Sequence, residues 1–197
     1  MATMQEEPSD EMLIRQALLL PQSNAFEQLI KRHQARLRLY LRSLTGNPAI
    51  ANELAQESLL KVHRSLNQFK FQSSFKTWLM RIARNTFLDH VRISSNAALF
   101  EPASVAAQAH HAEAQTSPSH EQASMLSIDI DRALLRLSAA EREVIAHCYF
   151  ADLSMDETAQ LLDLPIGTVK THTHRGLRKL RDALSAWQQA SPVKASQ

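Results

Sequence analysis

The sequence contains very little glycine, only three residues in 197. Tight turns, β-hairpins and phosphate-binding loops use glycine because it adopts positive φ angles at little steric cost. A β-sandwich, a Walker loop and a Rossmann dinucleotide fingerprint are therefore not expected. Alanine, leucine, glutamine, arginine and glutamate are abundant instead, and these residues favour helix. The composition predicts an all-α protein.

Cysteine and long apolar runs are also scarce. The single cysteine, Cys148, excludes a disulfide framework and a multi-thiolate zinc site, and is typical of a reducing compartment. No apolar run approaches the ~18 residues that a membrane span needs. The acidic start of the chain is unlike the basic start of a signal peptide. We therefore expect a cytoplasmic protein, and 44% hydrophobic with 21% charged residues indicates a globular one.

Charge is strongly segregated along the chain, although the net charge is only +2. Residues 10–92 carry 13 lysines and arginines against 6 acidic residues, a balance of +7. Residues 94–126 carry three glutamates and no cation, and residues 127–163 carry 3 cations against 8 acids, or −5. Residues 164–188 return to 5 cations against 1 acid. Two basic segments separated by an acidic stretch indicate two contacts with a polyanion, although charged helix faces can also be merely solvated.

The middle of the chain predicts a break between two domains. Residues 94–126 are small and polar, contain two prolines and show no helical apolar stripe, so we expect a flexible acidic linker. A helical domain is expected at residues 10–93 and a second domain at residues 127–188. The linker contains three histidines, His110, His111 and His120. No cysteine or aspartate cluster accompanies them, so neither a metal site nor a cofactor is expected.

The first domain is predicted to be a helical bundle. Its helices are expected at residues 10–20, 24–45, 49–66 and 75–92. Ser23 is expected to cap the second helix and Gly46 to end it. Residues 67–74 break the helical pattern and precede the last helix.

The second domain has the pattern of a helix-turn-helix. Two capping boxes, Ser138 with Glu141 and Ser154 with Glu157, predict the starts of two helices. A tight connection at residues 163–165 leads to a last helix with an apolar stripe that should pack on them. The stripe consists of Ile166, Val169, Thr173, Leu177, Leu180, Leu184 and Trp187.

The outward side of this last helix is predicted to enter the major groove of DNA. Its polar residues are Lys170, Thr171, His172, His174, Arg175 and Arg178. Lysine and arginine can donate to guanine, and threonine can contact thymine. Lys179 and Arg181, nearer the C-terminus, suit phosphates better. Residues two apart on a helix point about 200° from one another, so the two histidines cannot chelate a metal together.

A second candidate surface lies at residues 67–92. Trp78, Asn85 and Asp89 share one helix face, flanked by Arg81 and Arg84. Aromatic, amide, hydroxyl and cationic groups together can hold an unpaired or flipped base. Phe75 is expected in the core, whereas for Trp78 a core role and a base contact remain equally open.

These residues resemble the extracytoplasmic-function (ECF) group of the sigma-70 family, the sigma factors of bacterial RNA polymerase. In the first domain the matching words are Leu54-Ala55-Gln56-Glu57-Ser58-Leu59-Leu60, Phe75-Lys76-Thr77-Trp78-Leu79-Met80-Arg81-Ile82-Ala83-Arg84-Asn85 and Asp89-His90-Val91-Arg92. In the second they are Ser154-Met155-Asp156-Glu157-Thr158-Ala159 and Gly167-Thr168-Val169-Lys170-Thr171. The order and spacing of both sets together are highly specific.

The resemblance implies that the two domains have different functions and that neither contains catalytic residues. The first domain would bind core RNA polymerase at the clamp helices and open the promoter −10 element, and the second would contact the flap and read the −35 element. Polymerase contacts carry over to Glu53, Leu54, Gln56, Glu57 and Leu60. Contacts with the −10 element fall on Asn67, Lys70, Phe71, Ser73, Trp78, Arg81, Arg84, Asn85 and Asp89. An anti-sigma factor is implied as a further partner, and no small-molecule substrate.

The linker length implies a need for a scaffold. The two promoter elements lie ~25 base pairs apart, roughly 85 Å along B-form DNA. Residues 94–125 average roughly 30 Å end to end as a flexible coil. We therefore expect the free protein to bind promoter DNA poorly.

Three other functions remain as alternatives. A helix-turn-helix regulator that binds a palindrome as a dimer would self-associate. A protein-interaction adaptor would tolerate neutralisation of its basic helix. An enzyme is the least expected, because no nucleophile, paired-carboxylate or metal constellation is readable.

Overall fold

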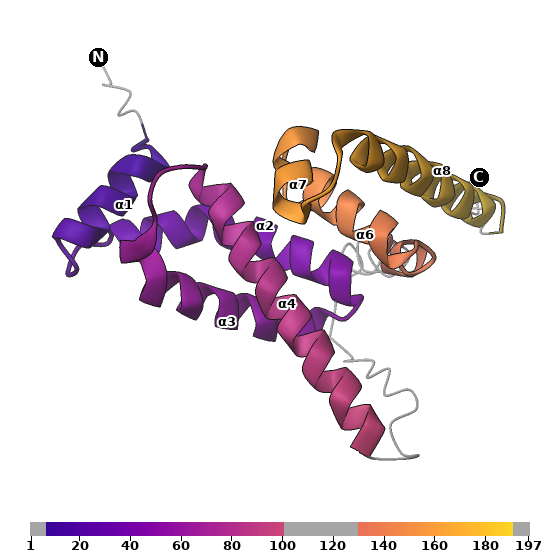
Figure 1. Cartoon of the computed structure of the whole chain (residues 1–197), viewed down its shortest axis with the longest axis horizontal. Helices are drawn as coiled ribbons and strands as arrows, with labels where there is room; N and C mark the ends of the chain where they lie inside the picture. The colour runs from indigo at the N-terminus through magenta and orange to yellow at the C-terminus, as the bar shows by residue number, and fades with distance from the viewer. Residues whose placement is uncertain (1–6, 101–129, 191–197) are drawn as a thin grey trace, which may run out of the picture.

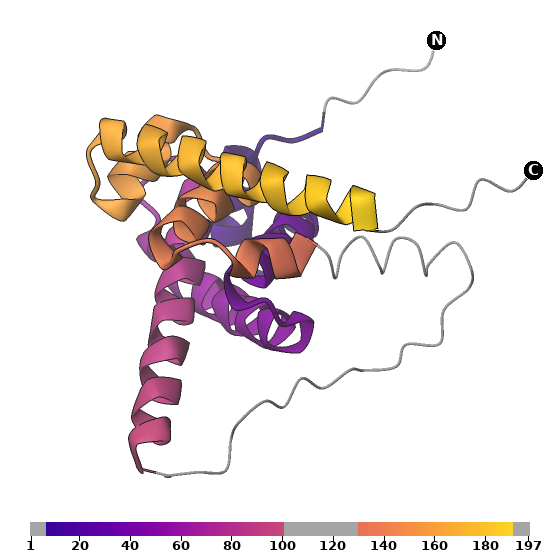
Figure 2. The same cartoon turned by 90° about the vertical axis from the view of Figure 1, so that its right-hand side faces the viewer.

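The computed structural model describes residues 7–100 and 130–190 (Figures 1 and 2). All regular secondary structure in these two ranges is helical, which confirms the predicted all-α class. We refer to residues 7–100 as the first unit and residues 130–190 as the second unit. None of the described helices is long and apolar enough to cross a membrane.

The first unit is a four-helix bundle with one short 3₁₀ turn. Its elements are α1 (Asp10–Leu19), α2 (Ala25–Thr45), α3 (Pro48–Ser65), η1 (Leu66–Gln68) and α4 (Phe75–Phe100). Helix α2 packs against α1, α3 and α4, and its apolar stripe forms the centre of the core. Helix α4 extends beyond the predicted Arg92 and past the proposed domain boundary at residue 93.

Local chemistry sets the helix ends of the first unit. The Asn47 side chain accepts hydrogen bonds from the amides of Ala49 and Ile50, and Pro48 occupies the first helical position, where its missing N–H costs nothing. Gly46 ends α2 with φ 64°, as predicted. The prediction that Ser23 caps α2 is wrong, because Asn24 holds the N-cap position without a side-chain bond.

The second unit begins with helical residues 130–135 and continues through three helices and a π turn. These are α6 (Ala139–Ile145), η2 (Ala146–Phe150), α7 (Met155–Leu162) and α8 (Ile166–Ala190). Both predicted capping boxes are present: each serine accepts from the glutamate amide, and each glutamate accepts from the serine amide. Asp163 adopts the left-handed conformation and ends α7.

Helix α8 packs on α6 through a glycine that sequence periodicity did not identify. A Cβ atom on Gly176 would lie 2.9 Å from Cγ1 of Ile145, so only glycine permits this approach. Val169 and Thr173 are buried as predicted. The prediction is wrong for Leu177 and Leu184, which are 39% and 38% exposed, because the contact surface turns toward Gly176. It is also wrong for Ile166, which is 37% exposed at the first position of α8.

The two units pack against one another. Helix α2 contacts η2 and α6, and α4 contacts α7, while α8 lies on the far side of α6 (Figures 1 and 2). Most buried apolar residues of both units join into one cluster, and Leu134, Leu137 and Ile145 form a second, smaller one. This arrangement places the start of α4 beside the second unit.

Candidate nucleic-acid interface

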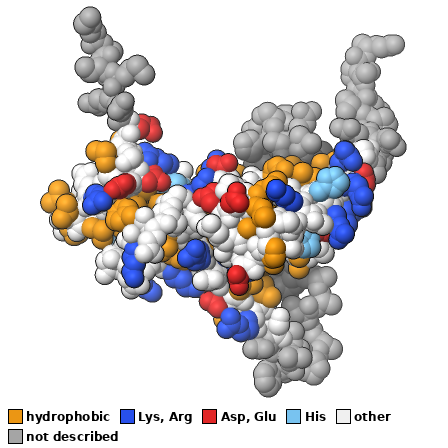
Figure 3. Space-filling view, turned by 45° about the horizontal axis from the view of Figure 1, so that its top comes forward, with side chains coloured by type: hydrophobic (Ala, Val, Ile, Leu, Met, Phe, Trp, Pro, Cys, Tyr) orange, Lys and Arg blue, Asp and Glu red, His pale blue; other side chains and the backbone are white. Residues whose placement is uncertain are grey.

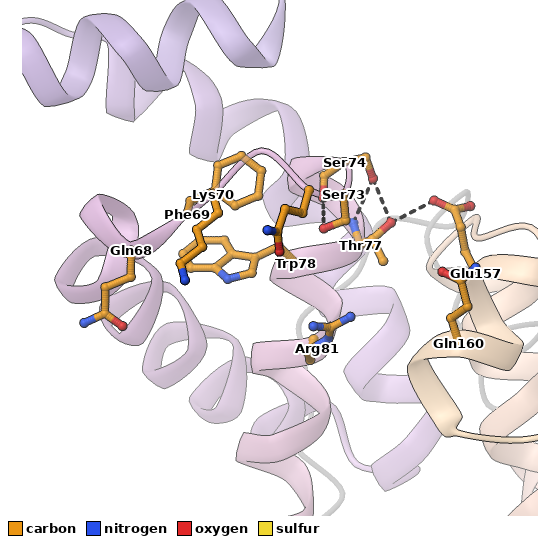
Figure 4. A pocket seen from close by; sticks show the side chains of 11 residues that line it. Gln68, Phe69, Lys70, Ser73, Ser74, Thr77, Trp78, Arg81, Glu157 and Gln160 are labelled. Carbon is orange, nitrogen blue, oxygen red and sulfur yellow. Dashed lines mark hydrogen bonds between the residues drawn. The ribbon is translucent and has the colours of Figure 1, made fainter.

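A cavity of about 450 Å³ lies where the loop after η1 meets the first turns of α4 (Figure 4). Its walls come from both units, because Glu157 and Gln160 of α7 complete the side opposite the loop. The first-unit lining residues are Gln68, Phe69, Lys70, Gln72, Ser73, Ser74, Thr77, Trp78 and Arg81. Most of this wall is polar or cationic, with one aromatic face.

An aromatic cluster holds the loop in place. Phe69 is 7% exposed, and its ring centroid lies 4.8 Å from that of Phe71 and 5.1 Å from that of Trp78. Phe71 adopts φ 57°, an uncommon conformation for a bulky residue, which the neighbouring contacts hold. The Arg15 guanidinium lies 4.9 Å from the centre of the Phe71 ring. The loop is therefore a packed structure despite its lack of helical periodicity.

Trp78 combines the two roles that the sequence left open. It packs on Phe69 and Phe75, with ring centroids 5.1 and 5.9 Å away, and it is half-buried. It also lines the cavity (Figure 4). An indole that is braced by neighbouring rings and lines a cavity can serve as a stacking platform.

The structure places the predicted −10 residues in two groups. Lys70, Ser73, Trp78 and Arg81 line the cavity together. The remaining predicted residues do not line it: Asn67, Phe71, Arg84, Asn85 and Asp89. Sequence reasoning did not single out Thr77, Glu157 and Gln160 for this site.

Two of the predicted −10 residues are engaged within the chain. Arg84 Nε donates to a carboxylate oxygen of Glu143 in the second unit at 2.5 Å. Asp89 lies 3.8 Å from the Lys61 ammonium and accepts from Arg92 at 3.3 Å. The Asp89 carboxylate therefore sits among cations, whereas Asn67 and Asn85 are exposed.

The outward face of α8 is largely free. Lys170, Thr171, His174, Arg175 and Arg178 are exposed. Figure 3 shows Lys, Arg and His side chains grouped on the side of the molecule where α8 lies. These exposed groups extend over two to three turns of one helix, which matches the footprint of a helix in a major groove.

Two other α8 residues depart from the predicted picture. His172 is half-buried, with an enclosed Nδ1 that has no hydrogen-bond partner, so it is not fully outward. Lys179 donates to Glu141 at 2.7 Å and is committed to the α6–α8 contact. The hydrogen bond from Lys179 lowers the pKa of Glu141 to about 2.

Helix α3 presents a second kind of surface. Glu53, Gln56, Glu57 and Leu60 are exposed and follow the three- and four-residue spacing of one helix face. Leu60 is 57% exposed, which is high for a large apolar side chain. The prediction of a surface contact by Leu54 is wrong, because this side chain is 2% exposed and belongs to the core.

Across residues 7–100 and 130–190 no group of three or more histidine, cysteine or acidic side chains is placed to hold a metal. The linker histidines His110, His111 and His120 lie outside the described residues. Cys148 is half-buried, and its Sγ lies 3.5 Å from the Thr158 hydroxyl.

Comparisons with known proteins agree with this two-part organisation. The family model for sigma-70 region 2 matches residues 29–96, and that for sigma-70 region 4 matches residues 127–180. The ECF RNA polymerase sigma factor SigL of Mycobacterium tuberculosis is 30% identical over 154 residues, which cover 78% of this chain and 85% of SigL. The chain belongs to the ECF sigma factors. The resemblance predicted from the sequence motifs is therefore confirmed.

Other family members and solved structures show the same relationship. SigW of Bacillus subtilis is 28% identical over 82% of this chain and 89% of its own length. SigE of Mycolicibacterium smegmatis is 30% identical over 82% of this chain, which spans 62% of that longer relative. RpoE of Bartonella quintana, solved with the anti-sigma factor NepR, matches at 26% identity with a TM-score of 0.65, over 83% of this chain and 98% of RpoE. CnrH, solved with the cytosolic domain of CnrY, shares the fold at 24% identity with a TM-score of 0.67, over 91% and 99% of the two chains.

Proposed function

We propose that this ECF sigma factor directs core RNA polymerase to promoters through two DNA contacts, one in each unit. The observation that carries the proposal is the pairing, on one chain, of an aromatic-walled cationic cavity with a separate exposed basic helix. A single site would serve a simple DNA-binding regulator. Two different sites fit a bipartite target whose elements are contacted in different ways.

The cavity beside α4 suits an unpaired base of the −10 element. The Trp78 indole offers a stacking surface, and Gln72 and Ser73 offer hydrogen-bonding groups for a base edge. Lys70 and Arg81 lie at the same cavity and can neutralise the flanking phosphates. In this role the first unit captures a base as the duplex opens.

The exposed face of α8 suits the −35 element in duplex form. Its first half carries Lys170 and Thr171, the part of a recognition helix that reaches base edges. Arg175 and Arg178 lie one and two turns further on and can contact bases or phosphates. The exposed face of α8 gives the protein its preference for a DNA sequence, while the first unit opens the DNA duplex.

The exposed face of α3 suits the polymerase. Leu60 provides an apolar anchor, and the surrounding Glu53, Gln56 and Glu57 provide a polar rim, the usual arrangement of a protein interface. We also propose an anti-sigma factor as a partner, since RpoE was solved with one. In this account the chain works in the cytoplasm, where polymerase and promoters meet, and adds no catalytic chemistry of its own.

Transcription in vitro tests the proposal. Core polymerase with and without the purified chain is supplied with genomic DNA fragments, and transcript starts are mapped. The proposal expects starts that depend on the chain and share two upstream elements. A chain that does not bind core polymerase, and instead protects two symmetric half-sites as a dimer, would contradict it.

A further inference from the structure

The contact between the two units is apolar and hydrogen-bonded at its centre. The Tyr40 hydroxyl of α2 lies 2.9 Å from Nε2 of His147 in η2, and both side chains are completely buried. Nδ1 of His147 lies 2.7 Å from the Glu143 carbonyl and must donate to it, so Nε2 accepts from Tyr40. This bond has a defined direction and fixes α2 against the second unit.

Ion pairs surround this centre, and in each of them the first unit supplies the cation. Arg36 and Lys76 both bind Asp152, with Arg36 at 2.5 Å. Arg84 pairs with Glu143 at 2.5 Å, outside the buried bond. At the far edge, Arg42 donates three hydrogen bonds to Asp131, at 2.7 and 3.0 Å to one carboxylate oxygen and at 3.2 Å to the other. The described part of the −5 segment, residues 130–163, is thus folded onto the +7 segment at residues 10–92.

The second unit also reaches the cavity itself. Glu157 of α7 accepts a hydrogen bond from the Thr77 hydroxyl at 2.8 Å, and Gln160 forms part of the cavity wall (Figure 4). Trp78 and Arg81 line the same space. Acidic groups of the second unit therefore occupy the surroundings of the residues that we assign to the −10 element.

This closed arrangement cannot contact both promoter elements together. Gln160 shares a cavity with Trp78, and only residues 163–165 separate α7 from α8. Helix α7 is about 12 Å long, so the start of α8 lies roughly 20–30 Å from Trp78. The two elements are roughly 85 Å apart. Residues 101–129, when fully extended, can reach roughly 95 Å, so the chain length permits separation of the units.

We propose that the second unit is a built-in competitor of DNA, whose acidic side chains dock on the basic face of the first unit until polymerase and promoter separate the two. This inference rests on the proposed function for the identity of the competing DNA, but the docking itself does not. The docking explains why residues 127–163 are acidic in a chain whose other folded segments are basic, as in a nucleic-acid-binding protein. It also gives the ion pairs of Arg84 and Lys76 a role in holding the free chain closed.

The test compares two pairs of substitutions that change the charge of the second unit equally. Glu143→Gln with Asp152→Asn removes two docking carboxylates, and asparagine tolerates the positive φ of Asp152. Asp156→Asn with Asp163→Asn is the matched control, since both carboxylates are exposed on the same unit and neither forms an ion pair with the first unit. Spin labels at cysteines replacing Ser94 and Ser185, both exposed, report the distance between the units in a Cys148→Ser background.

The second readout is affinity for a mixed-sequence single-stranded DNA of 15 nucleotides. All of these proteins also carry Lys170→Ala and Arg175→Ala, so that α8 contributes little to DNA binding. The docking pair should shift the distance distribution to longer values and tighten DNA binding about fivefold, as expected for the loss of three partly exposed ion pairs. The control pair should change neither measure by more than about twofold.

The proposal is overturned if the docking pair behaves like the control in either measure. It is equally overturned if the unsubstituted chain already shows long, broad distances between the units. Transcription with core polymerase is measured separately on the unsubstituted chain. Failure there removes the proposed function, whereas the distance measurement still decides whether the units dock.

Discussion

The cavity beside α4 and the exposed face of α8 differ in how many parts of the chain build them. In the closed arrangement the cavity is lined by a 3₁₀ turn, a loop held by Phe69, the first turns of α4 and two residues of α7. The α8 face needs one helix and the packing that orients it. The first surface is therefore sensitive to changes in the core and between units. The second should respond mainly to changes in its own side chains.

The largest effect should come from the anchor of the cavity loop. Phe69→Ala removes a buried ring from the aromatic cluster and should lower the free energy of unfolding by about 3–5 kcal/mol. Chemical denaturation measures this loss. The matched variant Phe71→Ala, at a residue that is 39% exposed, should cost much less. Equal losses in the two variants would show that the loop is not held by Phe69.

The contact between the units should weaken in acid. Burial lowers the pKa of His147 to about 4, against an ordinary 6.5, so the unfolded chain takes up a proton before the folded one does. Stability is therefore fully present above pH 6.5 and decreases as the pH falls toward 4, by up to about 3 kcal/mol. Denaturation between pH 6.5 and 5 measures the slope.

Two histidine variants separate this effect from general titration. His147→Gln should remove most of the slope, although it lowers stability at neutral pH. His174→Gln, at an exposed residue of α8, should keep the slope of the unsubstituted chain. An unchanged slope in His147→Gln would mean that other groups cause the acid sensitivity.

On α8, single truncations should lower specific binding by a moderate amount. Arg175→Ala and Lys170→Ala should each weaken promoter binding of the holoenzyme by about 1–3 kcal/mol. Binding is measured on a cognate promoter and on the same DNA with a scrambled −35 element. Equal losses on both DNAs would reassign these residues from base contacts to phosphate contacts.

At the cavity, Trp78→Ala should act on DNA opening with little effect on the initial closed complex. Loss of the stacking surface should cost the open complex about 1–3 kcal/mol. Permanganate reactivity of −10 thymines measures opening, and filter binding at low temperature measures the closed complex. Normal thymine reactivity in this variant would remove Trp78 from the base-binding role.

Sequence reasoning succeeded where the deciding interactions are local. Both capping boxes join residues three positions apart, and the left-handed Gly46 ends α2 through its own backbone. Such contacts can be predicted because the partners are fixed by spacing alone. The polar face of α8 was found for the same reason, since helical periodicity separates its exposed residues from Val169 and Thr173.

Tertiary contacts set the limits of that reasoning. Gly176 faces α6 because of a close approach to Ile145, and no propensity indicates this for a glycine in mid-helix. Leu54 was assigned to the polymerase contact by its place in the family motif, yet it is buried in the bundle. Glu157 was predicted only as a cap, and its second role at the cavity depends on the packing of α7 against α4.

Footprinting of the reconstituted holoenzyme on a chain-dependent promoter tests the central claim most directly. The account predicts two protected regions ~25 base pairs apart, or roughly 85 Å, with thymine reactivity at the downstream one and loss of upstream protection in Arg175→Ala. The chain without polymerase should protect neither region. Protection of two symmetric half-sites by the free chain would contradict the account.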